Sequence, residues 1–132
     1  MNIKDVMLSL DEFPVVTKDV IFKEVLEEMG NKKLGIACVV DENYKLLGIL
    51  TDGDIRRKIL SIQKPLSSIF IDDCLDHAIL SPKTISIDDP IIVAVNLMGE
   101  NKIWDLPVVE NGILKGLLHL HPLVNSLLKT KQ

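Results

Sequence analysis

Apolar residues at helical spacing mark the first part of the chain. They occupy positions i, i+3, i+4 and i+7 and so share one helical face: Phe22, Val25, Leu26 and Met29. A short extended run at 15–17 precedes this stripe, and two apolar runs at 36–40 and 46–50 follow it. The β-branched runs and the short polar turn between them indicate a hairpin, and the charged tail at 55–60 indicates a second helix. We therefore expect the order strand, helix, strand, strand, helix.

The same pattern returns in the second half of the chain. Met98 lies 69 positions after Met29 and belongs to an equivalent apolar stripe. Beyond the next turn the offset is 68, between Gly48 and Gly116, because the turn at 110–112 is one residue shorter than its counterpart. A period that is held through helix, strand and turn indicates an internal duplication.

This duplication predicts an α/β fold made of two β-α-β-β-α repeats. We expect the first repeat at 1–60, a linker at 61–80 with one turn of helix near its end, and the second repeat at 81–132. A half of about 50 to 60 residues cannot bury its own stripe and sheet face. We therefore expect the two halves to pack together about a pseudo-twofold axis.

Composition and charge exclude several classes of partner. An apolar content of 47% in 132 residues is enough for a core. The net charge of −4 and an aromatic content of 4% argue against nucleic-acid binding, which needs a basic face or stacking platforms. No apolar run approaches the ~20 residues that span a bilayer, and the N-terminus does not have the pattern of a signal peptide. We expect a cytoplasmic protein that binds neither nucleic acid nor membrane.

Neither cysteine has a motif that points to chemistry. Cys38 lies in an apolar strand and Cys74 in the expected linker, without C-x-x-C spacing, so both are predicted to be reduced thiols. The sequence contains no persuasive Ser-His-Asp or Cys-His order and no glycine-rich phosphate loop. We therefore predict no catalytic residue and no enzymatic activity.

The junction after the second strand has two interpretations. Thr51 ends the strand and Asp54 follows three residues later, which is the spacing of a helix capping box. The same geometry suits a ligand: free amides and the helix dipole favour a phosphate, the threonine hydroxyl donates to it, and the aspartate accepts from ribose hydroxyls. Spacing alone does not decide between the two.

The histidines and a pair of aspartates are weak candidates for a metal site. A zinc site normally needs three or four converging ligands. The histidines offer only His119 and His121, with His77 as a distant third ligand, and the aspartates offer only the pair Asp52 and Asp54. No metal is therefore predicted.

Two further features have an ordinary structural explanation. Arg56 and Arg57 fit a solvated helix face better than a phosphate contact. Trp104 fits a half-buried core aromatic better than a partner surface.

Several motifs resemble a tandem pair of CBS domains, often called a Bateman module. They are G-h-h-T-x-x-D at 48–54, P-V-V at 107–109 and the short acidic hairpin turn. More narrowly, the chain resembles the C-terminal CBS pair of the arabinose-5-phosphate isomerases of the sugar-isomerase family. The matching segments are D-E-F-P at 11–14, T-D-G-D-I-R-R at 51–57, S-P-K-T-I at 81–85 and G-L-L-H-L-H at 116–121.

The resemblance implies a non-catalytic regulatory pair that modulates an arabinose-5-phosphate isomerase in Kdo and sugar-phosphate metabolism. The catalytic sugar-isomerase domain is not in this chain, so we expect a regulatory fragment or a stand-alone copy that forms a homodimer and acts on that domain. Two alternatives remain open. One is a dimerisation module with a vestigial site, and the other is the CBS pair of a sugar nucleotidyltransferase, against which H-L-H at 119–121 argues.

The resemblance also implies a site for a nucleotide: AMP, ADP, ATP or a cytidine nucleotide-sugar, with no required cofactor. Thr51 and Asp54 would contact phosphate and ribose. The remaining positions carried over are Ile36, Ala37 and Cys38 near the base, and Val16 and Thr17 on the opposite wall.

The second repeat departs from this pattern. The offset of 68 puts His119 opposite Thr51 and Pro122 opposite Asp54, so the ribose-binding carboxylate is missing. Proline disfavours the α conformation at the residue before it, and the helix is expected to begin at Pro122. The sequence thus predicts two unequal clefts, of which the first has the nucleotide chemistry.

Overall fold

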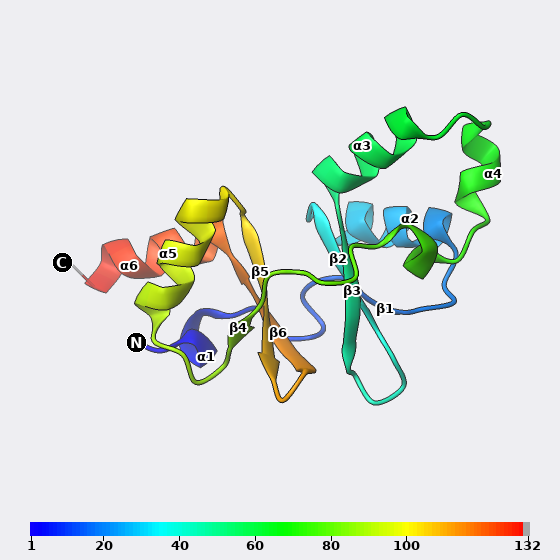
Figure 1. The fold of residues 1–132 in the computed structure, drawn as a ribbon. Helices are drawn as coiled ribbons and strands as arrows, with labels where there is room; N and C mark the ends of the chain where they lie inside the picture. Colours follow the sequence, from blue (N-terminus) through cyan, green and yellow to red (C-terminus); the bar gives the residue numbers. More distant parts are fainter. Residues whose placement is uncertain (131–132) are drawn as a thin grey trace. The chain divides into compact units, whose positions relative to one another are not determined.

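The computed structural model describes residues 1–130, which form two compact units (Figure 1). One unit is Asp11–Pro82, and the other combines Met1–Leu10 with the chain from Lys83 onward. Each unit holds one three-stranded sheet, in the order β1-β2-β3 or β4-β5-β6. The predicted α/β fold of two β-α-β-β-α repeats is confirmed.

The unit Asp11–Pro82 pairs β1 in parallel and β3 in antiparallel fashion with the central strand β2. Helices α2 and α3 supply Phe22, Met29 and Ile55 to a core shared with Ala37 and Leu50 of the sheet. The apolar stripe predicted from the sequence thus covers one sheet face. The elements are β1 Val15–Thr17, α2 Phe22–Lys32, β2 Ile36–Val40, β3 Leu46–Thr51, α3 Asp52–Ser61, α4 Leu66–Phe70 and the 3₁₀ helix η1 Cys74–His77.

The other unit repeats this arrangement, with β4 parallel and β6 antiparallel to the central strand β5. In its core, Ala94 and Met98 of helix α5 pack with Leu106 and Leu118 of the sheet. The elements are α1 Ile3–Val6, β4 Ile85–Ser86, α5 Ile91–Asn101, β5 Asp105–Glu110, β6 Ile113–His119 and α6 Leu120–Thr130. No helix in the described part of the chain is long and apolar enough to cross a membrane.

The outer strand of each sheet pairs with one further segment. Ile49 of β3 donates to the carbonyl of Ile79 at 3.0 Å and accepts from its amide at 2.8 Å. Leu117 of β6 makes the same reciprocal pair with Leu8, at 3.1 and 2.7 Å. Each such pair of hydrogen bonds, called a bridge below, leaves fewer unpaired backbone groups on the outer strand.

A glycine makes room for each bridge. A Cβ at Gly48 would lie 2.8 Å from the carbonyl oxygen of Ile79, and a Cβ at Gly116 would lie 2.6 Å from that of Leu8. These separations are too short for any other residue type unless the backbone moves. The glycine repeated at these two positions is therefore a packing requirement in both units.

The segment at 61–82 packs into the unit of the first repeat. Ile69 and Cys74 are buried in its core, and the amide of Phe22 donates to the carbonyl of Asp72 at 2.8 Å. The turn of helix expected near the end of this segment is present as η1, and α4 was not anticipated. The boundaries 1–60, 61–80 and 81–132 describe the repeat along the sequence and stay a prediction.

One helix begins earlier than expected, and another lacks a side-chain cap. Helix α6 begins at Leu120, two residues before Pro122, because a proline in the first turn replaces an amide that has no partner within the helix. Asp19 does not cap α2. Its carboxylate accepts from the hydroxyl of Thr17 at 3.0 Å, and the N-cap is Ile21, without a side-chain bond.

We expect Gly48→Ala and Gly116→Ala each to lower the free energy of unfolding by about 1–3 kcal/mol, because each added Cβ forces the bridging backbone away. Urea denaturation followed by circular dichroism measures this. Gly30→Ala and Gly99→Ala are the matched controls, since neither added Cβ meets any atom within 4 Å, and helical alanine is expected to be neutral or stabilising by up to ~1 kcal/mol. Equal effects in all four variants would refute the packing role.

Candidate functional site

The candidate site lies at the sheet edge where β2 begins and β3 ends. Ile36 stands opposite Thr51 in the register of the two strands, and the amide of Asp52 donates to the carbonyl of Gly35 at 3.0 Å. A Cβ at Gly35 would lie 2.6 Å from Oδ2 of Asp52. This glycine therefore lets the first acidic side chain of α3 lie against the start of β2.

Thr51 and Asp54 contact each other at the start of α3. Oγ1 of Thr51 accepts from the amide of Asp54 at 3.2 Å, and the threonine hydroxyl donates to Oδ2 of Asp54 at 2.7 Å. Thr51 is thus the N-cap of α3, as one of the two sequence interpretations proposed. Asp54 bonds to the threonine hydroxyl rather than to the backbone amide of the capping residue, so only half of a capping box forms.

The second oxygen of Asp54 is held by Arg57. Nη2 of Arg57 donates to Oδ1 of Asp54 at 2.8 Å, with side-chain exposures of 63% and 27% respectively. Partial burial by itself would raise the pKa of Asp54, but hydrogen bonds from Arg57 and Thr51 and the charge of Arg57 outweigh it and lower that pKa. Asp54 is therefore an anion at neutral pH with both oxygens engaged.

The three candidate residues on β2 are fully buried and face two ways. Ala37 belongs to the core cluster under the helices, whereas Ile36 and Cys38, one residue to each side, face the opposite side of the sheet. The structure thus places Ile36 beside Thr51 on the neighbouring strand, and Ala37 in the core under the helices.

Val16 and Thr17 lie on β1, at a distance from that edge. Val16 pairs with Val39 and packs against the helix-side core. Thr17 pairs with Val40, which is about 13 Å from Ile36 along β2 by the rise of a strand. Within this unit the structure does not bring Thr17 to the edge with Thr51 and Asp54, so its place on an opposite wall stays a prediction.

Sequence reasoning missed three contributors to this edge: Gly35, Gly53 and the contact of Arg57. The aspartate and arginine stand at i and i+3 on one helix, which is the spacing of a helical ion pair and a signal that could have identified this contact. The glycines give no such signal, because their role depends on which side chain folds over them.

The second repeat places a different pair at the equivalent edge. Asp105 stands opposite His119 in the register, and Nδ1 of His119 lies 2.7 Å from Oδ1 of Asp105. Asp105 was not among the predicted residues. Among residues 1–130 no group of three or more His, Cys, Asp or Glu side chains is placed to hold a metal ion.

Both cysteines are buried. Burial, with a smaller contribution from the negative charge of Asp73, raises the pKa of Cys74 to about 11. The thiol therefore stays protonated at neutral pH and is a poor nucleophile.

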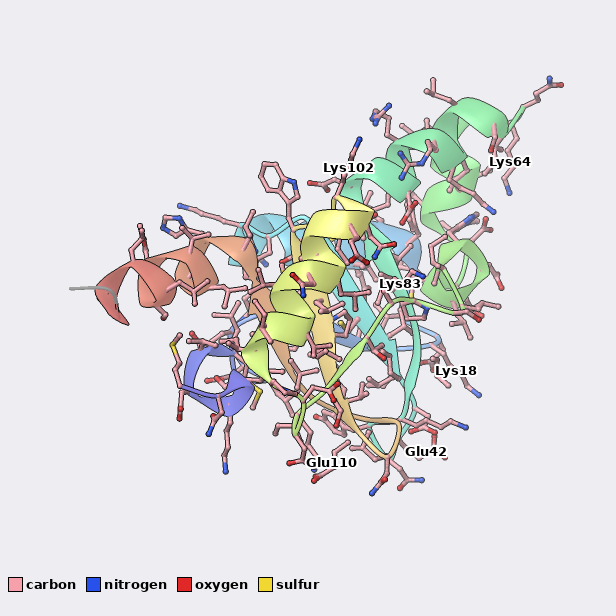
Figure 2. The ribbon with its side chains drawn as sticks, turned by 60° about the vertical axis from the view of Figure 1, so that its left-hand side comes forward. Lys18, Glu42, Lys64, Lys83, Lys102 and Glu110 are labelled. Carbon is pink, nitrogen blue, oxygen red and sulfur yellow. The ribbon has the colours of Figure 1, made fainter. Side chains whose placement is uncertain are left out.

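An apolar groove lies between α5 and α6. It has a volume of about 300 Å³, and residues that line it include Val95, Met98, Trp104, Leu123, Val124 and Leu127. Trp104 is 69% exposed, so the expectation of a half-buried core aromatic is wrong. Lys102, another lining residue, lies at the end of α5 and points away from the ribbon (Figure 2).

The two units define a tandem pair of one small α/β module. The family model for the CBS domain matches residues 3–61 and 76–126. The chain belongs to the CBS domain family and contains a tandem pair of these domains, as the sequence resemblance implied.

The sequence is similar to those of several curated bacterial proteins. Uncharacterized protein RP505 of Rickettsia prowazekii is 35% identical over 94% of this chain and 37% of its own length. Arabinose 5-phosphate isomerase KdsD of Escherichia coli K12 is 30% identical over 96% of this chain and 37% of its own length. This similarity confirms the resemblance to the CBS pair of the arabinose-5-phosphate isomerases. The chain spans little more than a third of these relatives.

A solved structure covers almost the whole chain. The crystal structure of CBSX2 of Arabidopsis thaliana in complex with AMP has a TM-score of 0.85 and 27% identity, and the match covers 99% of this chain and 98% of CBSX2. The tandem arrangement is therefore common to both proteins.

We expect Arg57→Gln to raise the pKa of Asp54 toward its ordinary value, because the variant removes a hydrogen bond and a positive charge from the carboxylate. Carboxyl ¹³C shifts followed by NMR across a pH titration measure this, with Arg56→Gln as the control that leaves Asp54 unchanged. A group with a lowered folded pKa stabilises the protein above its unfolded pKa, and this contribution is lost as pH falls through the folded value. The stability difference between wild type and Arg57→Gln that is due to Asp54 should therefore shrink as pH falls below about 3.8 and vanish only below the lowered folded pKa. An unchanged pKa in Arg57→Gln would contradict the pairing.

Proposed function

We propose that this CBS pair binds a nucleotide at the first repeat, through Thr51 and Asp54, and regulates a sugar-phosphate isomerase. The observation that carries the proposal is the junction of β3 and α3. There an ionised carboxylate and a hydroxyl lie side by side at the positive end of a helix. CBSX2, a protein of the same fold at 27% identity, was crystallised with AMP.

The proposed chemistry follows from the donors and acceptors at this junction. The helix N-terminus and the hydroxyl of Thr51 favour a phosphate, and the carboxylate of Asp54 accepts from ribose hydroxyls. The backbone of β2 at Ile36, Ala37 and Cys38 is proposed to lie near the base. Candidate ligands are AMP, ADP, ATP and a cytidine nucleotide-sugar such as CMP-Kdo.

The proposed target is an arabinose-5-phosphate isomerase. The identity to KdsD spans 96% of this chain, yet only 37% of the isomerase, so the isomerase has a large region outside the match that would hold the catalytic domain. CBS pairs are generally regulatory rather than catalytic, and we assign this chain no catalysis of its own. The cytoplasmic location expected from the sequence stays a prediction.

We expect calorimetric titration with AMP, ADP, ATP, CMP and CMP-Kdo to reveal saturable binding of at least one ligand at one site. Asp54→Ala should weaken that binding about ten- to a hundredfold, because it removes the charged acceptor for the ribose diol. The matched control is His119→Ala at the equivalent position of Thr51 in the second repeat, which should leave the affinity unchanged. If none of the five ligands binds the folded protein, the nucleotide function is wrong.

A second candidate function is dimerisation, and the apolar groove between α5 and α6 favours it. Its rim exposes 69% of Trp104 and 40% of Val124, next to the buried Leu123. Exposed aromatic and aliphatic side chains around a hydrophobic groove are typical of interfaces. We propose that a second copy of this chain covers the groove, which matches the homodimer expected from the sequence.

We expect the wild-type protein to sediment as a dimer and Val124→Glu to shift it to the monomer, because the variant would bury an unpaired charge in the interface. Sedimentation equilibrium over a range of concentrations measures the shift. Tyr44→Glu is the control, since Tyr44 is an exposed apolar residue in the hairpin of the other unit. A monomeric wild type, or an equal shift in both variants, would exclude the groove as the interface.

A further inference from the structure

We propose that Arg57 makes the first site selective for phosphorylated nucleosides, because the ligand's phosphate replaces Asp54 as the partner of its guanidinium. This inference rests on the proposed nucleotide function. It assigns a specificity role to a residue that the sequence analysis interpreted as part of a solvated helix face.

Both oxygens of Asp54 already have partners: Oδ2 accepts from the hydroxyl of Thr51 at 2.7 Å, and Oδ1 accepts from Arg57 at 2.8 Å. A carboxylate has about four lone-pair sites, so a ribose diol that approaches Asp54 either shares an oxygen with these donors or displaces one of them, and the exchange takes the second course. The arginine is the easier partner to displace, because its side chain is 63% exposed and exposed ion pairs are weak.

The guanidinium of Arg57 lies close to the backbone at the start of α3. A Cβ at Gly53 would lie 3.1 Å from Nη2 and 3.4 Å from Nη1 of Arg57, so the guanidinium lies over the first turn of α3. A cation near a helix N-terminus is opposed by the helix dipole, and here the carboxylate of Asp54 compensates for it. The absence of a side chain at Gly53 gives the arginine room to lie there.

A nucleoside that displaces Arg57 leaves the guanidinium without an anion at the positive end of α3. A nucleotide supplies a phosphate within the same molecule, and arginine binds phosphate with the same forked geometry that it uses for carboxylates. The exchange is therefore favourable only for a ligand that carries both a ribose diol and a phosphate.

Arg56 provides a matched control on the same helix. It carries the same charge, is exposed like Arg57, and points about 100° away around the helix axis. A nonspecific effect of positive charge on an anionic ligand would involve both arginines, whereas the exchange involves Arg57 alone.

The experiment compares AMP with adenosine, and CMP with cytidine, by calorimetry on wild type, Arg57→Gln and Arg56→Gln at low ionic strength. We expect wild type to bind the nucleotide of one pair about tenfold or more tightly than its nucleoside. Arg57→Gln should lose most of this preference by weakening nucleotide binding, with nucleoside binding unchanged or tighter. Arg56→Gln should behave as wild type, and Arg57→Lys should retain part of the preference.

The outcomes separate this inference from the function on which it rests. If Arg57→Gln weakens nucleotide and nucleoside equally, or if Arg56→Gln loses the same preference, the exchange is wrong and nucleotide binding stands. If wild type binds neither member of either pair, the nucleotide function at this site is wrong for both bases and the exchange fails with it. Urea midpoints of the variants identify any loss of affinity that is due to unfolding.

Discussion

Close approach of two backbones over a missing side chain is the constraint on which both units depend. Each sheet ends in an outer strand, β3 or β6, and in each the glycine at position 48 or 116 lets another segment form two reciprocal hydrogen bonds with it. Ile79 precedes β4 in the sequence and Leu8 precedes β1, so each outer strand pairs with a segment that leads into the other sheet. Neither unit is therefore complete within the residues of its own repeat.

At the candidate site the same atoms stabilise the helix start and belong to the proposed binding site. Thr51 caps α3 and also holds Asp54, while Arg57 neutralises that carboxylate in the unliganded protein. Both oxygens of Asp54 thus have a partner in this structure. Because the pairs are at the surface, a ligand with suitable groups can replace them without disturbing the buried core.

Elements with a strong local pattern could be predicted from the sequence, and features that depend on distant contacts could not. The stripe of Phe22, Val25 and Met29 and the hairpin of β2 and β3 follow from spacing alone. The exposure of Trp104 could not be predicted, because an aromatic next to a strand is as compatible with a core as with a groove. At the site, Thr51 and Asp54 follow from a motif, whereas the roles of Gly35 and Gly53 depend on side chains that fold over them.

The segment before each repeat's first strand pairs with the outer strand of the other repeat, and this crossed pairing bears on how such a chain could have arisen. A single ancestral repeat whose leading segment paired with the outer strand of a second molecule would form a domain-swapped dimer. Gene duplication and fusion place donor and acceptor in one polypeptide, so that the pairing no longer depends on protein concentration. The bridges at Gly48 and Gly116 are consistent with that history, in which an assembly of two molecules became a single chain.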